Sequence, residues 1–254
     1  MSSQVFRQSI LALAVMALGS NMASAAVVSI DQRSALAGKV TEGDAPGFPV
    51  TISEPGSYVL RSNLVVKDAG VTVIEITASD VTIDLAGFTI GGPNTCAGTP
   101  VECTVHGGGI GVKAVADAGP SPENVRVMNG MVRGMGGHGI RLIGNGTAVE
   151  RVHAVSNGGP GIVVGQGSII DSVAMSNGSG AAVVGLIVRG TVAMNNAFGI
   201  FIRPGGVATG NSAIANAATG LSVQCPAVVV GNSTSNNGTN VQVTGVCAVA
   251  DHAQ

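Results

Sequence analysis

The stretch Asn157-Gly-Gly-Pro-Gly-Ile-Val-Val164 contains the motif that decides the fold: an Asn, then a Gly-apolar pair at the start of a short Val/Ile run. The Asn returns at steps of 20, 19, 20 and 20 residues. The full series is Asn157, Asn177, Asn196, Asn216 and Asn236. A period of about 20 residues is typical of solenoid proteins, in which each repeat forms one structural unit.

The segments between these Asn residues are short, rich in Val, Ile and Ala, and bounded by Gly, Asn or Ser. Such segments favour strands and tight turns over helices. One repeat cannot bury its apolar side alone, so successive repeats are expected to stack in parallel about 4.8 Å apart and to share a core. We therefore predict an all-β protein, a single-stranded parallel β-helix with about 20 residues per coil.

An Asn at a fixed place in each coil has two structural uses. The bend between two strands needs a residue that tolerates the left-handed αL region, which Asn does better than other non-glycine residues. Stacked Asn side chains can also form hydrogen bonds along the stack. We expect the five Asn residues to line up along one edge of the solenoid.

Other solenoids fit the spacing less well. A left-handed hexapeptide helix needs about 18 residues per coil, and the steps of 19 to 22 residues in this chain depart from that value. The glycine- and aspartate-rich nonapeptide of calcium-binding β-rolls does not occur in the sequence.

Residues 1–25 have the features of a secretory signal, with Arg7 ahead of an apolar run and Ala23-Ser-Ala25 as a cleavage site. We predict cleavage near Ala25, secretion or export to the periplasm, and no membrane span in the mature chain. Residues 26–254 are expected to form one β-helix domain, with an N-terminal cap at 26–50 that includes a short helix. Loop insertions are expected at 91–109 and 117–122.

Four cysteines suit an oxidising compartment. Cys96 and Cys103 lie seven residues apart in one loop-like stretch, and Cys225 and Cys247 lie 22 residues apart, each at the start of an apolar run. Equivalent positions in adjacent coils have Cα atoms about 5 Å apart, within reach of a disulfide. Of the three pairings that four cysteines allow, we predict Cys96–Cys103 and Cys225–Cys247, the latter joining the last two coils.

The composition excludes several classes of protein. Charged residues make up only 10% of the chain and the formal net charge is −2, which excludes a disordered chain. The 12 basic and 14 acidic residues are balanced, which excludes a polybasic nucleic-acid binder. There is no Trp and only one Tyr, so base stacking is also disfavoured. No nucleic-acid partner is expected.

Three stretches outside the regular repeat carry a resemblance. They are Ile52-Ser-Glu-Pro-Gly-Ser-Tyr-Val-Leu60, Ser79-Asp-Val-Thr-Ile-Asp-Leu-Ala-Gly-Phe-Thr-Ile90 and Glu123-Asn-Val-Arg-Val-Met-Asn-Gly-Met-Val-Arg-Gly134. With the repeat, they make the chain resemble the right-handed parallel β-helix superfamily, the pectate-lyase-like fold of many exported bacterial proteins. The resemblance covers roughly residues 45–247 and implies a right-handed coil. It implies no single activity, because the superfamily contains lyases, hydrolases, epimerases, tailspikes and adhesins.

The enzymes of that superfamily act on acidic polysaccharides. The resemblance implies carboxylates that hold Ca²⁺ and an Arg or Lys base for a lyase, or clustered Asp for a hydrolase. From 156 to 254 the charged residues are Asp171, Arg189, Arg203 and Asp251, too few for such a site. Any site is therefore expected between Glu54 and Asp171. The candidates are Asp84 and Glu150 as acid or cation-binding residues, with Arg126, Arg133 or His138 as the base.

The coil period also predicts which of these residues meet. One position of the coil is expected to bring Asp84, Met128 and Glu150 together, and the next to place Asn129, Arg151 and Asp171 in a column. An exposed ion pair of Arg151 with Asp171 would contribute about 0–1 kcal/mol. Cations and histidines are dense in this part of the chain, and an acidic glycan could lie across them. They are Lys113, Arg126, Arg133, Arg141, Arg151, His138 and His153.

Two functional hypotheses follow from the sequence. The preferred one is a non-catalytic exported β-helix that presents long parallel faces for surface recognition, with an acidic polysaccharide as the expected partner. The alternative is a lyase, hydrolase or epimerase acting on an acidic polysaccharide. No cofactor is expected under the first hypothesis, and Ca²⁺ is expected only if the protein is a lyase.

Overall fold

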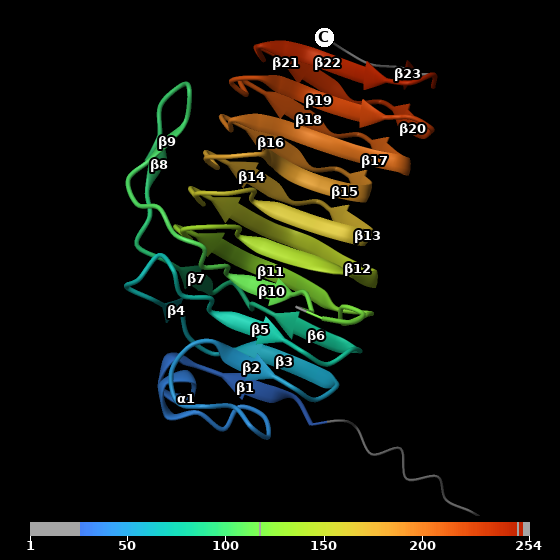
Figure 1. The fold of residues 1–254 in the computed structure, drawn as a ribbon. Coiled ribbons are helices and arrows are strands. Elements are labelled where there is room, and N and C mark those ends of the chain that lie inside the picture. Colours follow the sequence, from blue (N-terminus) through green and yellow to red (C-terminus); the bar gives the residue numbers. More distant parts are fainter. Residues whose placement is uncertain (1–25, 117, 248, 251–254) are drawn as a thin grey trace, which may run out of the picture.

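The computed structural model describes residues 26–116, 118–247 and 249–250. It is nearly all β: about nine coils of about 21 residues stack in parallel into a solenoid (Figure 1). The all-β solenoid that the repeat predicts is thereby confirmed. The predicted signal segment 1–25 lies outside the described residues.

Each coil passes through three parallel sheets, which we name the first, second and third faces in chain order. The first face contains β2 (Val50–Ile52), β5 (Ile74–Ile76), β10 (Val112–Ala114), β19 (Thr219–Gln224) and β22 (Thr239–Thr244). The second contains β1 (Val28–Ile30), β3 (Gly56–Leu60), β6 (Val81–Asp84), β20 (Ala227–Val230) and β23 (Val249–Ala250). The third contains β4 (Leu64–Val65), β7 (Thr89–Gly91), β14 (Val173–Met175), β16 (Val192–Met194), β18 (Ser212–Ile214) and β21 (Ser233–Ser235).

Longer strands continue around the corners between faces. β13 (Ile162–Ile170), β15 (Ala181–Arg189) and β17 (Phe198–Thr209) run from the first face to the second. β11 (Arg126–Arg133) runs from the second to the third, and β12 (Ile140–Val155) passes through all three.

Small apolar side chains fill the narrow interior. On the second face Val149 pairs in register with Ile169, which pairs with Val188, and all three are fully buried. On the third face the same inward position is held by Ala174 and Ala193. Because side chains alternate along a strand, the residues on either side of each inward residue point out of the solenoid. Function must therefore be carried by these outward columns, the corners and the loops.

A ladder of buried Asn side chains runs along the corner between the third and first faces. The Oδ1 atom of Asn177 accepts from the backbone N–H and the side-chain Nδ2 of Asn157, at 3.1 and 2.9 Å. The same pair of bonds joins each following step, through Asn196, Asn216 and Asn237. Four members of the predicted series are confirmed.

The fifth member of the predicted series is wrong. Asn237 accepts the hydrogen bonds from Asn216, and Asn236 instead has a left-handed backbone with φ of 56°. The residue before each ladder Asn makes the αL bend, for example Ser156 and Ala215 at φ 53°. The bend and the ladder therefore use consecutive residues, and the expectation that one Asn serves both purposes is corrected.

A second ladder lies at the corner between the second and third faces. Here Asn211 accepts from the backbone of Thr191 at 2.9 Å, and Asn232 accepts from Asn211 in turn. Ser172 occupies the same place lower in the stack and accepts from the backbone of Val152. The residues before them, Asp171 among them, again have positive φ. Two corners of each coil are thus held by the same backbone geometry.

The N-terminal end is closed by a short helix. α1 (Gln32–Ala37) starts at Asp31, whose side chain accepts from the backbone N–H groups of Arg33 and Ser34. Figure 1 shows α1 beneath β1 and β2, and its Ala35 is fully buried in the core. The described part of the chain contains no helix of the length and apolar character that a membrane span requires.

Both predicted disulfides are confirmed. Cys96–Cys103 closes an antiparallel hairpin of β8 (Cys96–Ala97) and β9 (Glu102–Cys103). Cys225–Cys247 links equivalent positions one coil apart, with a Cα–Cα distance of 5.6 Å. The β8–β9 hairpin rises beside the stack in Figure 1, and its backbone at Cys96 accepts from Ser156 Oγ at 3.4 Å. The 91–109 insertion therefore lies against the corner that carries the Asn ladder.

Candidate functional site

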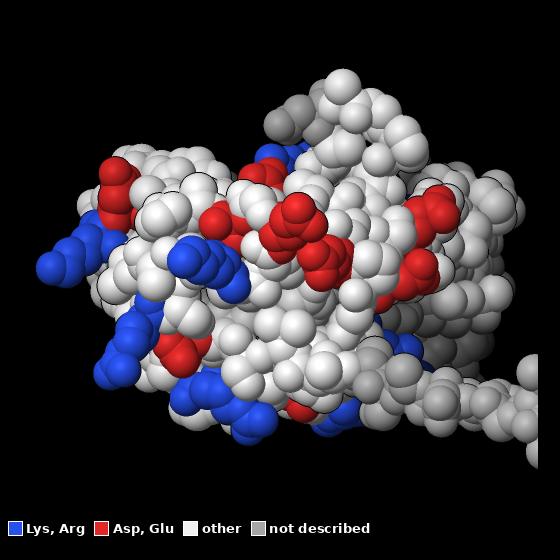
Figure 2. All heavy atoms as spheres, turned by 90° about the horizontal axis from the view of Figure 1, so that it is seen from below, with Lys and Arg blue, Asp and Glu red and all other residues white. Residues whose placement is uncertain are grey.

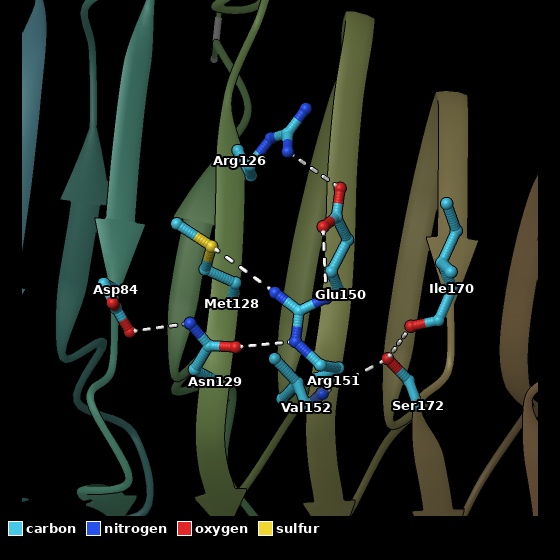
Figure 3. Close-up of polar contacts among 9 residues, drawn as sticks. All are labelled: Asp84, Arg126, Met128, Asn129, Glu150, Arg151, Val152, Ile170 and Ser172. Carbon is cyan, nitrogen blue, oxygen red and sulfur yellow. Dashed lines mark hydrogen bonds and ion pairs between the residues drawn. The ribbon is translucent and has the colours of Figure 1, made fainter.

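A cluster of polar and charged side chains lies on the outer surface of the second face and at its corner (Figure 3). Asp84 and Glu150 each pair in register with Met128, so two strand steps separate them, about 10 Å. This confirms the predicted column of the three residues. Arg126 comes from the same face, and the corner residues Asn129 and Arg151 lie between the two carboxylates. We call Asp84, Arg126, Asn129, Glu150 and Arg151 the second-face cluster.

Each member of the second-face cluster has a partner. Glu150 Oε1 lies 3.0 Å from Arg126 Nη1, and Glu150 Oε2 lies 3.7 Å from Arg151 Nη1. Arg151 Nε donates to Asn129 Oδ1 at 2.8 Å, and Asn129 Nδ2 donates to Asp84 Oδ1 at 3.1 Å. The chain of contacts links the two carboxylates through an amide and a guanidinium. Both oxygens of Glu150 face cations, which suits an ion-pair acceptor better than a general acid.

The structure separates the remaining candidates from this cluster. Arg133 lies at the end of β11 on the third face, exposed, next to Val155 of the following coil. His138 lies before the first face, in the Gly-rich turn that precedes β12. The five candidate catalytic residues therefore do not converge: Asp84, Glu150 and Arg126 come together, whereas Arg133 and His138 lie at other faces.

Two further expectations about charge are corrected. Arg151 turns toward Glu150 and Asn129 and not toward Asp171, because Glu150 precedes it in the chain and Asn129 lies directly below. The cations expected to form one patch are divided among the three faces, since neighbouring residues of a coil point in different directions. Figure 2, a view of the N-terminal end, shows basic and acidic side chains interspersed. Residues 204–250, by contrast, contain no charged residue.

A groove lies between the disulfide-closed loop and the Gly-rich turns of three coils. It comprises a cavity of about 450 Å³ lined by His106, His138 and Arg141, and an adjoining one of about 420 Å³ lined by Glu102 and Cys103. The two cavities share His106, Gly158 and Ser179 and so form one depression. We call this depression the loop groove.

Glycine forms the floor of the loop groove because the backbones there approach too closely for side chains. A Cβ on Gly136 would collide with the carbonyl oxygen of Ala69, and one on Gly158 with that of Gly136. A Cβ on Gly178 would collide with Cys103 Sγ, so this glycine lets the disulfide lie against the turn. The floor is therefore mostly bare backbone, on which a flat ligand can rest.

Arg141 gives the loop groove its charge. It points out of the first face beside Lys113, which is paired with Glu75 at 2.8 Å. Within the described residues Arg141 itself makes no hydrogen bond or ion pair, so its guanidinium is available to a ligand. Burial lowers the pKa of His138, and the positive charge of Arg141 lowers it further. His138 is consequently neutral at pH 7 and can donate or accept a hydrogen bond.

Neither region resembles a metal centre. Among the residues that the structure describes, no three His, Cys, Asp or Glu side chains are grouped so that they could hold a metal ion. The chemistry of the two regions is therefore that of hydrogen bonds and charge. The second-face cluster is internally satisfied, whereas the loop groove presents an unpaired Arg and a neutral His.

Sequence reasoning missed two relations within these regions. Asn129 was placed in a column with Arg151, but its role as the link between Arg151 and Asp84 depends on side-chain direction. His106 and His138 line the same cavity although 32 residues separate them, since the loop folds back onto the stack. The only sequence signal was the glycine on both sides, in His106-Gly-Gly-Gly109 and Gly136-Gly-His-Gly139.

Comparison of the chain with models of known protein families, with curated proteins and with solved structures gave no match.

Proposed function

We propose that this protein is a non-catalytic, exported β-solenoid that binds an acidic polysaccharide in the loop groove. The observation that carries the proposal is the unpaired guanidinium of Arg141 beside the neutral His138, above a floor of bare backbone. An Arg fork matches the two oxygens of a carboxylate, as on a uronic acid. The groove is open along the stack, which suits a chain-like ligand.

Two further parts of the proposal concern origin and compartment. We place the chain in the right-handed pectate-lyase-like superfamily, which the parallel coils and the stretches at 52–60, 79–90 and 123–134 support. We also propose that the protein is secreted or periplasmic after cleavage near Ala25. Two disulfides support this compartment, because cytosolic thiols are kept reduced.

Binding of hexagalacturonate, measured by isothermal titration calorimetry, tests the groove. We expect Arg141→Ala to weaken binding by about ten- to a hundredfold, as for the loss of a charge-assisted hydrogen bond. Arg189→Ala is the matched control, because Arg189 is exposed at the end of β15 on the second face, away from the groove. Equal affinities of the two variants, or no binding by the unaltered protein, would overturn the proposal.

A second candidate function, a polysaccharide lyase or hydrolase, rests on the second-face cluster. Asp84, Glu150 and Arg126 share one outer surface, as a carboxylate site would require. Incubation with polygalacturonate, with and without Ca²⁺, tests it by the absorbance of unsaturated products and by new reducing ends. Turnover that Glu150→Gln abolishes would establish this enzyme and displace the binding function. Binding without turnover supports the preferred one.

A further inference from the structure

The outer surface of the first face carries a second hollow, three strand steps from Arg141 toward the C-terminal end. Arg141 pairs with Val163, Val163 with Val184, and Val184 with Phe201. The hollow is a cavity of about 260 Å³, and its lining includes Phe198, Phe201, Thr219, Ser222 and Gln242. We call it the phenylalanine hollow.

The hollow arises from the sizes of outward side chains in consecutive coils. Phe201 of β17 pairs with Ser222 of β19, which pairs with Gln242 of β22. A small side chain thus stands between two large ones, and Thr219 is a second small residue of the lining. The depression is therefore built into the regular stack and needs no loop to form it.

Its walls combine an aromatic surface with free polar groups. Phe198 is 44% exposed, which is unusual for a large apolar side chain in a chain with only five Phe and no Trp. Thr219 Oγ1 lies 3.4 Å from Gln242 Oε1 in a long hydrogen bond. Within the described residues the hydroxyl of Ser222 and the Nε2 group of Gln242 have no hydrogen-bond partner.

The charge of the lining selects the ligand. No residue that lines the hollow is charged, and neither is any residue from 204 to 250. An anionic sugar would lose water there without gaining a cation, which disfavours it. A ligand with an apolar surface and several hydroxyl groups matches both the ring of Phe198 and the free groups of Ser222 and Gln242.

We infer that the phenylalanine hollow is a subsite for an uncharged sugar ring, with the C–H face of the sugar on Phe198 and its hydroxyls toward Ser222 and Gln242. The inference rests on the proposed function and extends it. Three strand steps place this subsite about 14 Å from Arg141 along the first face. The ligand class is then a heteropolysaccharide that carries both acidic and neutral units.

Fluorine NMR of the protein labelled with 4-fluorophenylalanine tests the subsite. Phe48 and Phe88, which lie in the N-terminal coils away from the hollow, serve as internal references. We expect a neutral probe from the set cellohexaose, xylohexaose and mannohexaose to move the Phe198 and Phe201 signals and to leave the references unmoved. Hexagalacturonate should not move the Phe198 signal.

Two variants and a control measure the contributions of the walls. Phe198→Leu keeps an apolar side chain but removes the ring, and Gln242→Ala removes the amide. Each should weaken binding of the neutral hexaose by about tenfold. Gln224→Ala is the matched control, because Gln224 is exposed at the end of β19 and does not line the hollow. Its affinity should equal that of the unaltered protein.

The outcomes separate this inference from the proposed function. A neutral response that survives in Arg141→Ala supports the subsite, whether or not hexagalacturonate binds in the loop groove. Binding of hexagalacturonate with no response to any neutral hexaose overturns the subsite alone. Equal movement of the Phe198 signal by acidic and neutral probes overturns the neutral assignment. A response to N-acetylleucine amide and to none of the sugars would make the hollow an apolar peptide site, and the inference wrong.

Discussion

Replacing Asn196 by Ala removes the middle of the ladder that holds the corner between the third and first faces. Asn196 is fully buried and makes four hydrogen bonds with its side chain. Its Oδ1 accepts from the backbone N–H and the Nδ2 of Asn177, at 2.9 and 3.0 Å. Its Nδ2 donates to Ala174 O and to Asn216 Oδ1, both at 3.0 Å.

The expected cost follows from these bonds. At about 1 kcal/mol of net stabilisation per hydrogen bond, losing all four lowers the free energy of unfolding by about 4 kcal/mol. The backbone N–H of Asn177 and the carbonyl of Ala174 are left buried without these partners, which works in the same direction.

Asn195→Ala is the matched control for this substitution. Asn195 is exposed and makes the αL bend, with φ of 54°. One coil further on, Ala215 adopts the same conformation with φ of 53°, so Ala is tolerated at this place. The expected cost of the control is about 1 kcal/mol or less.

Urea denaturation followed by far-UV circular dichroism measures both variants. Because a repeat protein need not unfold in one step, hydrogen exchange of the Asn177 amide is measured in parallel. That amide should lose protection in Asn196→Ala and keep it in Asn195→Ala. If both variants had the same denaturation midpoint and the same Asn177 exchange rate, the ladder would not be what stabilises the corner.

Three further predictions concern pH, the disulfide and the surface charges. The lowered pKa of His138 means that the unfolded chain binds more protons, so stability should fall as the pH drops below about 6.5. His138→Gln should remove that part of the decline in a series of urea midpoints. Replacing Cys225 and Cys247 by Ser should destabilise the last coil by about 3 kcal/mol, seen as faster hydrogen exchange confined to its strands. Glu150→Gln breaks an ion pair whose Arg126 side chain is 50% exposed, so the midpoint should shift by at most about 1 kcal/mol. A shift well above that would show that the second-face cluster is structurally important.

Much of the fold could be predicted because the corners repeat with the same chemistry. The Asn157–Asn216 spacing set the coil length, and the cysteine pairing followed from it. The assignment failed at Asn236-Asn237, where two Asn residues stand side by side and the period alone cannot say which one turns inward. The second ladder was missed because its members differ in type, from Ser172 to Asn211, although their geometry is shared.

The site was less predictable because it depends on direction and on a long loop. The period brought Asp84 and Glu150 together but could not show that Glu150 is occupied by two cations. The approach of His106 to His138 depends on the path of the 91–109 insertion, which no repeat specifies. The phenylalanine hollow depends on the contrast in size between Phe201 and Ser222, which becomes visible only when consecutive coils are in register.

The Asn ladder also makes the number of coils adjustable. Residues 177–195 begin at one ladder Asn and end just before the next, and Ser176 and Asn195 share the same αL conformation. Excising them would join Ser176 to Asn196 and recreate the original joint, so the shortened chain should fold with an unchanged β-type circular dichroism spectrum. This segment lies between Arg141 and Phe198. Gain or loss of one such module would therefore move the two ends of a bound glycan by a single strand spacing, which makes the solenoid a ruler whose graduations are its own repeats.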